Sequence, residues 1–157
     1  MPPIYKIGNM LDKLSECDLF CITTNGTLRG DGKLVMGRGI AFQSIKHFPS
    51  IQSVAGHHIR QFNETHKTAP IPYGLLILKE FEPSIGLFQV KYNWWEPAQC
   101  KLIEWSTSKL RQLALDHPTK KIMLNFPGIG NGKLTQAEVR PIIDGLPSNV
   151  EVWKLYE

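Results

Sequence analysis

The sequence predicts an α/β fold, a three-layer α/β/α sandwich with a mixed, largely parallel sheet. Short apolar runs of strand length alternate along the chain with longer segments in which apolar residues recur at helical spacing. The 157 residues suit one domain, and no repeat, linker or low-complexity segment divides them, so 1–157 is expected to form a single domain. A composition of 42% hydrophobic and 20% charged residues is ordinary for such a domain.

The first half of the chain is expected to hold two strands and then two helices. Residues 19–22 form a continuous apolar run, as in a strand buried on both faces, and a shorter strand is expected at 5–7. The polar, glycine-rich segment 23–33 predicts a loop. Helices are expected over 39–48 and 50–63, the first of them stopped by a proline.

The second half begins with two neighbouring strands and then alternates helices with strands. Strands are expected at 73–78 and 85–91, with Pro83-Ser84 in the turn between them. An apolar face at helical spacing predicts a helix over 99–116. The remaining elements are, in order, a strand at 121–126, a helix at 136–143 and a strand at 150–155.

Two glycine-rich segments, far apart in the chain, each lie between a predicted strand and a predicted helix. They are Val35-Met36-Gly37-Arg38-Gly39-Ile40-Ala41 and Asn125-Phe126-Pro127-Gly128-Ile129-Gly130-Asn131-Gly132-Lys133-Leu134. Glycine lets a backbone approach a ligand closely, and the start of a helix offers free amides and a partial positive charge. Ligands of such sheets bind beyond the carboxyl ends of the strands, so the two loops together predict a cradle for a diphosphate. For either loop alone, turn formation and close packing are the alternative.

Two familiar phosphate-binding motifs do not fit the second loop. A P-loop that ends at Gly132-Lys133 would place its first glycine at Pro127, and Leu134 replaces the Ser or Thr that holds magnesium. A dinucleotide fingerprint fails because Gly128-Ile129-Gly130 is followed by the next glycine one residue early. The sequence therefore argues against a P-loop ATPase and against a Rossmann dehydrogenase.

The net charge, the cysteines and the histidines limit which ligands and which cellular compartment are expected. The net charge of +4 favours an anionic ligand without identifying it. The three cysteines lack metal-ligand spacing and are expected to be reduced thiols, as is typical of a cytoplasmic protein. No signal peptide and no apolar run of about 18 residues is present, so neither export nor a membrane partner is expected. The histidines also lack ligand spacing, and neither a metal site nor a cofactor is expected.

Three segments follow one another in an order that covers nearly the whole chain: Ile22-Thr23-Thr24-Asn25, residues 35–41 and residues 126–134. Together they resemble the macrodomain family, an ADP-ribose-binding fold. The most similar branch is that of the terminal ADP-ribose protein glycohydrolase and of the antitoxin that removes ADP-ribose from DNA. The resemblance implies binding of ADP-ribose and hydrolysis of an ADP-ribosyl linkage on DNA or protein. It also suggests a toxin ADP-ribosyltransferase as a partner.

The resemblance assigns residues to parts of this ligand. Asn25 is similar to the asparagine that hydrogen-bonds the distal ribose, although an Asn before Gly26 can also serve a turn alone. Backbone amides, rather than side chains, are expected to carry most of the phosphate binding. The implied ligand-binding residues are Asn9 near the adenine, Met36, Gly37, Gly39 and Ile40 in the first loop, and Gly128, Ile129, Gly130, Asn131 and Gly132 in the second.

Lys91 is the residue to which the resemblance assigns catalysis, together with Asn25. It ends a predicted strand at a position similar to the family lysine that attacks or stabilises C1″ of the distal ribose. A lysine amine can open the sugar and form a Schiff base, and partial burial lowers its pKa toward a usable range. From the residues alone, a solvated lysine at the end of a strand is the alternative.

Three features depart from the family pattern. Where the family has an aspartate that binds the adenine amino group, this chain has Asn9, whose amide oxygen can still accept that hydrogen bond without charge. The protein-directed glycohydrolase carries an aspartate just after the second loop, whereas the next carboxylate here is Glu138, which favours a DNA-directed activity. An insertion at 28–34 brings Arg29 and Lys33, which either meet substrate phosphates or form a solvated hairpin tip.

Other functions stay open at the level of the sequence. The chain can be a reader that binds ADP-ribose without turnover, or a phosphatase that acts on ADP-ribose-1″-phosphate. A structural or RNA-binding protein would explain the positive charge but not the paired glycine loops. The Trp94-Trp95 pair can stack on a nucleobase or pack at the rim of a site.

Overall fold

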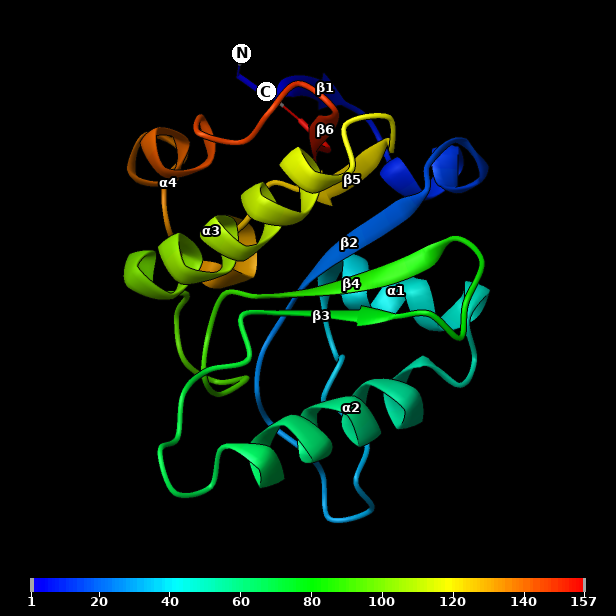
Figure 1. Ribbon diagram of the computed structural model, residues 1–157, viewed down its shortest axis with the longest axis vertical. Helices are drawn as coiled ribbons and strands as arrows, with labels where there is room; N and C mark the ends of the chain where they lie inside the picture. Colours follow the sequence, from blue (N-terminus) through cyan, green and yellow to red (C-terminus); the bar gives the residue numbers. More distant parts are fainter. Residues whose placement is uncertain (1, 157) are drawn as a thin grey trace.

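The computed structural model describes residues 2–156, which form one central sheet with helices on both faces (Figure 1). The strands are β1 (Ile4–Ile7), β2 (Leu19–Thr24), β3 (Leu75–Leu78), β4 (Ser84–Gln89), β5 (Ile122–Asn125) and β6 (Val150–Lys154). Within the described residues they form one six-stranded sheet in the order β1-β6-β5-β2-β4-β3. β3 and β4 pair antiparallel, and the other four neighbouring pairs are parallel. The predicted mixed, largely parallel sheet is therefore confirmed.

Two pairs of helices cover the two faces of the sheet. They are α1 (Gly39–His47) and α2 (Ile51–Thr65) on one face and α3 (Cys100–Asp116) and α4 (Gln136–Ile143) on the other. In Figure 1, α1 and α2 lie away from α3 and α4, with the central strands between them. This is the three-layer arrangement that the alternation of apolar runs and helical segments predicts.

The central strand β2 shows how one apolar run serves two cores. Phe20 and Ile22 belong to the core beneath α1 and α2, whereas Leu19 and Cys21 belong to the core beneath α3 and α4. Successive side chains of a strand point to opposite faces, so a strand that is covered on both faces is apolar at consecutive positions. Gly86 of β4 pairs with Cys21, and a Cβ at Gly86 would lie only 2.6 Å from the Cys21 sulfur.

The observed elements follow the predicted ones, with differences at their ends. Ser84 is already part of β4, and this strand ends at Gln89, so Lys91 lies just beyond the strand rather than within it. Two short 3-10 helices escaped the sequence analysis: η1 (Met10–Glu16) and η2 (Gly130–Gly132). Neither is long enough to show an apolar periodicity, which is the signal that reveals a helix in a sequence. Among the described residues, no helix combines the length and the apolarity needed to cross a membrane.

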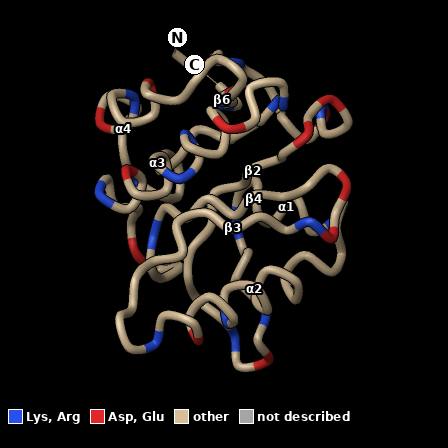
Figure 2. Tube along the Cα trace, viewed as in Figure 1, with Lys and Arg blue, Asp and Glu red and all other residues tan. Residues whose placement is uncertain are grey.

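The insertion at 28–34 is a hairpin tip that packs on α2. Leu28 and Leu34 form a bridge at its base, and Arg29 pairs with Asp31 at 3.2 Å in solvent. Neither Arg29 nor Lys33 lines the cavities described below, and the Arg29–Asp31 pair at the tip is exposed to solvent. In Figure 2, positive and negative residues are interspersed along the trace, this tip included.

The contact between this hairpin and α2 depends on Gly56. A Cβ at Gly56 would lie 1.9 Å from the Gly32 carbonyl oxygen, which is a backbone atom that cannot rotate away. Gly56→Ala is expected to lower the free energy of unfolding by about 1–3 kcal/mol, as overpacking does. Urea unfolding measures this change. Gly30→Ala is the matched control because no atom lies within 4 Å of a Cβ at Gly30, and equal losses in the two variants would contradict the packing.

Candidate functional site

Two adjoining cavities lie at the carboxyl edge of the parallel strands. The first, of about 310 Å³, contains Lys91 and Asn25 in its lining and is here termed the Lys91 cavity. The second, of about 460 Å³, contains Asn9 and is termed the Asn9 cavity. Both are lined by the same five residues from the two glycine loops and the end of β5: Gly39, Ile40, Asn125, Ile129 and Asn131. The cavities are therefore the two ends of one cleft, and the loops meet at its middle.

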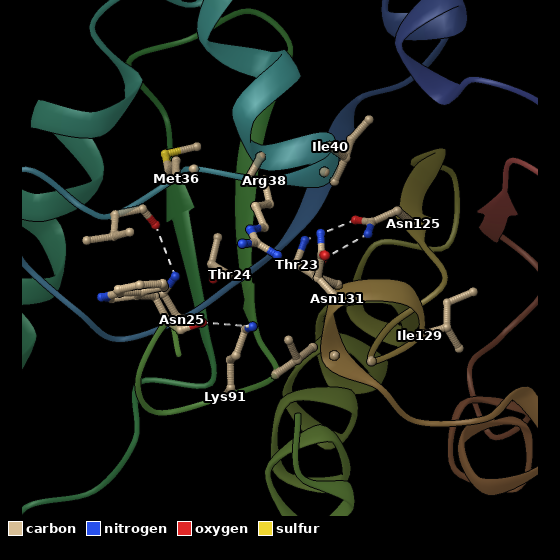
Figure 3. A pocket seen from close by; sticks show the side chains of 18 residues that line it. Thr23, Thr24, Asn25, Met36, Arg38, Ile40, Lys91, Asn125, Ile129 and Asn131 are labelled. Carbon is tan, nitrogen blue, oxygen red and sulfur yellow. Dashed lines mark hydrogen bonds between the residues drawn. The ribbon is translucent and has the colours of Figure 1, made fainter. Parts of the chain in front are cut away.

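Figure 3 shows the side chains of the first cavity. Asn25 and Lys91 lie at one end, Ile40 and Ile129 at the other, and the Arg38 side chain lies between them. The structure brings together residues that are up to about a hundred positions apart in the sequence. Within the Lys91 cavity, these include most of the residues to which the family resemblance assigns a role: Asn25, Met36, Gly37, Gly39, Ile40, Lys91, Gly128, Ile129, Asn131 and Gly132. Asn9 and Gly130 line the Asn9 cavity instead.

Free backbone amides from both loops lie at the middle of the cleft. α1 begins at Gly39, and the first amides of an α-helix, here those of Gly39, Ile40 and Ala41, have no partner within the helix. In the second loop, the amides of Gly130 and Asn131 donate to no group among the described residues. Amides at the start of a helix attract anions, so the middle of the cleft suits a phosphate group.

Different structural constraints explain the glycines of the two loops. Gly37 and Gly130 have no atom within 4 Å of a Cβ, so packing does not require them. Gly128 has a φ of +80°, and its Cβ would lie 2.8 Å from Ile103 Cδ1. A Cβ at Gly132 would lie 3.0 Å from that of Ala98. Close packing therefore accounts for Gly128 and Gly132, and a left-handed φ of +66° accounts for Gly130. Gly37 is explained by neither and has open space around its Cβ position.

Asn25 holds the first loop in place. Its Nδ2 donates to the Val35 carbonyl at 3.0 Å, and its Oδ1 accepts from the Thr27 amide at 2.9 Å. The side chain is buried and lines the Lys91 cavity. Because an asparagine amide has two N–H donors, one N–H is left after the bond to Val35. The residue thus serves the turn that the sequence allows, and it also keeps a donor for a ligand.

Lys91 is half-buried at the rim of its cavity. Its Nζ donates to the Trp94 carbonyl at 3.1 Å. Burial lowers the pKa of Lys91, and the positive charges of Arg38 and Lys133 lower it further. A lowered pKa increases the fraction of neutral amine, which is the form that can act as a nucleophile.

Carboxylates are missing from the lining of both cavities among the described residues. Glu138, the first carboxylate after the second loop, belongs to the capping box of α4: Thr135 donates to its Oε1 from the amide at 2.9 Å and from the hydroxyl at 3.0 Å. These bonds with Thr135 lower the pKa of Glu138 and keep it ionised. Glu138 therefore serves the helix rather than the cleft.

Asn9 also has a structural task. Its Oδ1 accepts from the Leu11 amide at 3.0 Å and caps η1. Its Nδ2 donates to no group of the described residues. Asn9 therefore keeps two Nδ2 N–H donors, and its Oδ1, with a second lone pair, can accept one further hydrogen bond, as the sequence prediction requires.

Three further residues that line the Lys91 cavity were given no site role by the sequence analysis: Thr23, Arg38 and Asn125. Asn125 Oδ1 accepts from the Thr23 amide at 3.0 Å, and its Nδ2 donates to the Thr23 hydroxyl at 2.8 Å. Arg38 adds a positive charge, and Trp94, which is 49% exposed, stands at the rim. A polar residue at the end of an apolar strand, as at Asn125, is the signal that would have revealed this pair.

Metal ligands do not gather in the part of the chain that the structure describes. No group of three His, Cys, Asp or Glu side chains there could hold a metal ion.

Solved structures of macrodomains share this fold. No protein-family model matches the sequence, and no curated protein matches it either. The macrodomain of Thermus aquaticus DarG is 24% identical with a TM-score of 0.68, over 99% of this chain and 97% of that chain. Thermosipho africanus DarTG in complex with ADP-ribose is 19% identical with a TM-score of 0.73, over 93% of this chain and 39% of that chain. The macrodomain of Mycobacterium tuberculosis DarG is 18% identical with a TM-score of 0.65, over 96% of each chain. This chain therefore has the macrodomain fold.

Replacement by alanine is expected to have different effects at a closely packed loop glycine and at one that has open space around its Cβ position. Gly37→Ala is expected to change the free energy of unfolding by less than about 0.5 kcal/mol, and to weaken ADP-ribose binding at least about tenfold because the methyl group projects into the cleft. Gly128→Ala is expected to cost about 2 kcal/mol of stability because its backbone is left-handed and its Cβ has no room. Urea unfolding and calorimetric titration measure the two effects, and a similar loss of stability in both variants would contradict this distinction.

Proposed function

We propose that this macrodomain-fold chain binds ADP-ribose along the cleft and hydrolyses an ADP-ribosyl linkage at the Lys91 end. The observation that carries the proposal is the order of groups along the cleft. An apolar cavity lies at one end, free amides of two loops lie at the middle, and a lysine of lowered pKa lies at the other end. ADP-ribose has the same order of parts: a base, a diphosphate and a distal ribose.

Each part of the ligand has a matching surface. The Asn9 cavity offers the rings of Phe126 and Trp153 and the side chain of Ile129 to a flat base. The amides of Gly39 and Gly130 face the position of the diphosphate, where Arg38 adds charge. The distal ribose then reaches Asn25 and Lys91, which line the other cavity.

The chemistry of this proposal needs no group beyond the chain and water. The neutral Lys91 amine attacks C1″ of the distal ribose, an N–C1″ bond forms, and the bond from C1″ to the modified group breaks. The modified group leaves with a proton. Water then cleaves the N–C1″ bond, which releases ADP-ribose and restores the lysine. In the alternative role, a charged Lys91 stabilises negative charge that develops on the leaving group.

A non-catalytic reader is the second candidate, and a specific observation favours it. No carboxylate lines the cleft within the described residues, so an acid or base that would assist the leaving group is missing there. A reader binds ADP-ribose and releases no product from any ADP-ribosylated substrate. An ADP-ribose-1″-phosphate phosphatase would use the same end of the cleft, and release of inorganic phosphate from that compound would identify it.

The rim of the Lys91 cavity supports ADP-ribosylated DNA as the substrate. Trp94 and Trp95 are 49% and 64% exposed, and their rings are in edge contact with centroids 5.9 Å apart. Exposed tryptophans stack on nucleobases, and the cations Arg38 and Lys133 near Lys91 suit a nucleic-acid phosphate. The enzyme would then remove the ADP-ribose that an ADP-ribosyltransferase, such as a toxin of that class, attaches to DNA.

Replacement of Lys91 tests the proposed reaction. Lys91→Ala is expected to lower hydrolysis of ADP-ribosylated single-stranded DNA at least about 100-fold, while binding of free ADP-ribose changes little because the loops hold the diphosphate. Lys91→Arg keeps the charge without a usable neutral amine, and should be as inactive as the alanine variant if the lysine is a nucleophile. Release of ADP-ribose, followed by chromatography, is the measurement.

The outcomes of that experiment separate the candidates. Full activity of Lys91→Ala would remove Lys91 from the mechanism. Activity of Lys91→Arg with loss in Lys91→Ala would assign it the role of a fixed charge. Tight ADP-ribose binding without product from modified DNA, modified protein or the 1″-phosphate would establish the reader.

The pH dependence of hydrolysis tests the environment of Lys91. Activity that needs the neutral amine rises as the pH rises through the pKa of Lys91. Arg38→Gln removes a positive charge that lowers this pKa, so the pKa rises and the ascending limb of the kcat profile is expected to move to higher pH. Lys133→Gln should move it in the same direction but less, since Arg38 has the larger effect. An unmoved limb, or one at lower pH, would contradict the assignment.

A further inference from the structure

A chain of hydrogen bonds joins Asn25 to the amine of Lys91. Asn25 Oδ1 accepts from the Thr27 amide at 2.9 Å, and Thr27 Oγ1 accepts from the Trp94 amide at 3.0 Å. The Trp94 carbonyl in turn accepts from Lys91 Nζ at 3.1 Å. We propose that Thr27 is a positioning residue, whose hydroxyl fixes the backbone of Trp94 and thereby orients the Lys91 amine. This inference rests on the proposed function, because it concerns the amine that attacks C1″.

The Trp94 carbonyl lies in a turn formed by residues 93–96. Within this turn, the Asn93 amide and Nδ2 donate to Glu96 Oε1 at 2.9 and 2.8 Å, and the Glu96 amide donates to the Asn93 carbonyl at 3.1 Å. These bonds keep the shape of the turn but do not attach it to the sheet. Apart from the lysine bond, the bond from Trp94 to Thr27 is the only hydrogen bond between the turn and the rest of the described chain. The Thr27 hydroxyl therefore determines where the turn is held.

Orientation of the amine matters because its lone pair forms the bond to C1″. A neutral amine that donates one N–H to a fixed carbonyl, as Lys91 does to Trp94, has its lone pair directed away from that carbonyl. The flexible four-carbon stem of a lysine would otherwise allow many directions. Alignment of the reacting atoms contributes several orders of magnitude to the rates of intramolecular reactions. A fixed Trp94 carbonyl therefore favours attack, and a loose one slows the reaction without removing the amine.

Thr27 is itself held by bonds that do not involve its side chain. Its amide donates to Asn25 Oδ1, and its carbonyl accepts from the Val35 amide at 3.0 Å. The hydroxyl is therefore presented to Trp94 from a backbone that is fixed on the first glycine loop. Removal of the hydroxyl leaves both backbone bonds in place, so the first loop and Asn25 should keep their positions.

Two substitutions separate the effect of the hydroxyl from that of the side-chain shape. Thr27→Val replaces the hydroxyl by a methyl group of similar size, and Thr27→Ser keeps the hydroxyl. The Thr27–Trp94 bond is exposed, so water can accept from the Trp94 amide, and both variants should unfold at the urea midpoint of the wild type. Thr107→Val is the matched control, because the buried Thr107 hydroxyl on α3 has no hydrogen-bond partner among the described residues.

The test measures kcat and KM for release of ADP-ribose from ADP-ribosylated single-stranded DNA, together with the dissociation constant of free ADP-ribose. Thr27→Val is expected to lower kcat at least about tenfold, because the amine loses its orientation. The dissociation constant should stay within about twofold of the wild type, since the groups that bind the diphosphate are unchanged. Thr27→Ser should recover kcat to within about threefold of the wild type, because it restores the bond to Trp94. Thr107→Val should match the wild type in all three constants.

The outcomes separate this inference from the proposed function. Wild-type kcat in Thr27→Val would overturn the positioning role and leave the proposed hydrolysis standing. Equal losses of kcat in Thr27→Ser and Thr27→Val, or an equal loss in Thr107→Val, would also overturn it, because the bond from the hydroxyl to Trp94 would then not be the cause. Weaker ADP-ribose binding that accounts for the whole loss in Thr27→Val would replace positioning by a binding role. No release of ADP-ribose by the wild type would overturn the proposed hydrolysis and this inference together.

Discussion

The parallel pairing of β2 with β5 is the constraint on which the site depends. Cys21 pairs with Leu124, and beyond this point Asn125 hydrogen-bonds both the amide and the hydroxyl of Thr23. Because both strands run in the same direction, the segments that follow them leave the sheet at the same edge. The two glycine loops therefore face each other although some ninety residues separate them. A sheet of the same strands in antiparallel order would place the loops at opposite edges.

The position of the two glycine loops determines where an anionic group can bind. Residues at the start of α1 and in the second loop line the middle of the cleft, and their unpartnered amides supply partial positive charge that is fixed by the backbone. Arg38 and Lys133 add full charges near Lys91, and they contribute with burial to its lowered pKa. Cations that would favour a bound diphosphate thus also increase the fraction of neutral amine at Lys91. One electrostatic environment serves binding and the proposed chemistry together.

The sequence predicts the parts of the fold that depend on local pattern. Continuous apolar runs indicate buried strands, and helix α4 has the bounds 136–143 that the sequence analysis expects. The family resemblance places Asn25, Lys91 and most of the loop residues around one cavity, as the structure has them. Contacts across the fold are not visible in a local pattern. The Thr23–Asn125 pair joins residues 102 apart, and the packing of Gly32 on Gly56 holds the insertion against α2.

Asn9 shows most clearly why the identity of a residue is not enough to predict its structural task. The sequence shows an asparagine at position 9, but only the structure shows that its side-chain oxygen caps η1. A short 3-10 helix leaves no periodic signal, so neither the helix nor its cap could be inferred. The structural task of Asn9, which is to cap η1, is thus visible from its hydrogen bond to Leu11 and not from the residue type.

The central claim is that both loops bind one ligand. The most direct measurement is an NMR titration with ADP-ribose that follows the backbone amides of Gly39, Ile40 and Ala41 and those of Gly130 and Asn131. The account predicts that both groups of amides shift together and saturate with one dissociation constant. Shifts confined to one loop, or two separate saturation curves, would contradict a single cradle formed by the two loops.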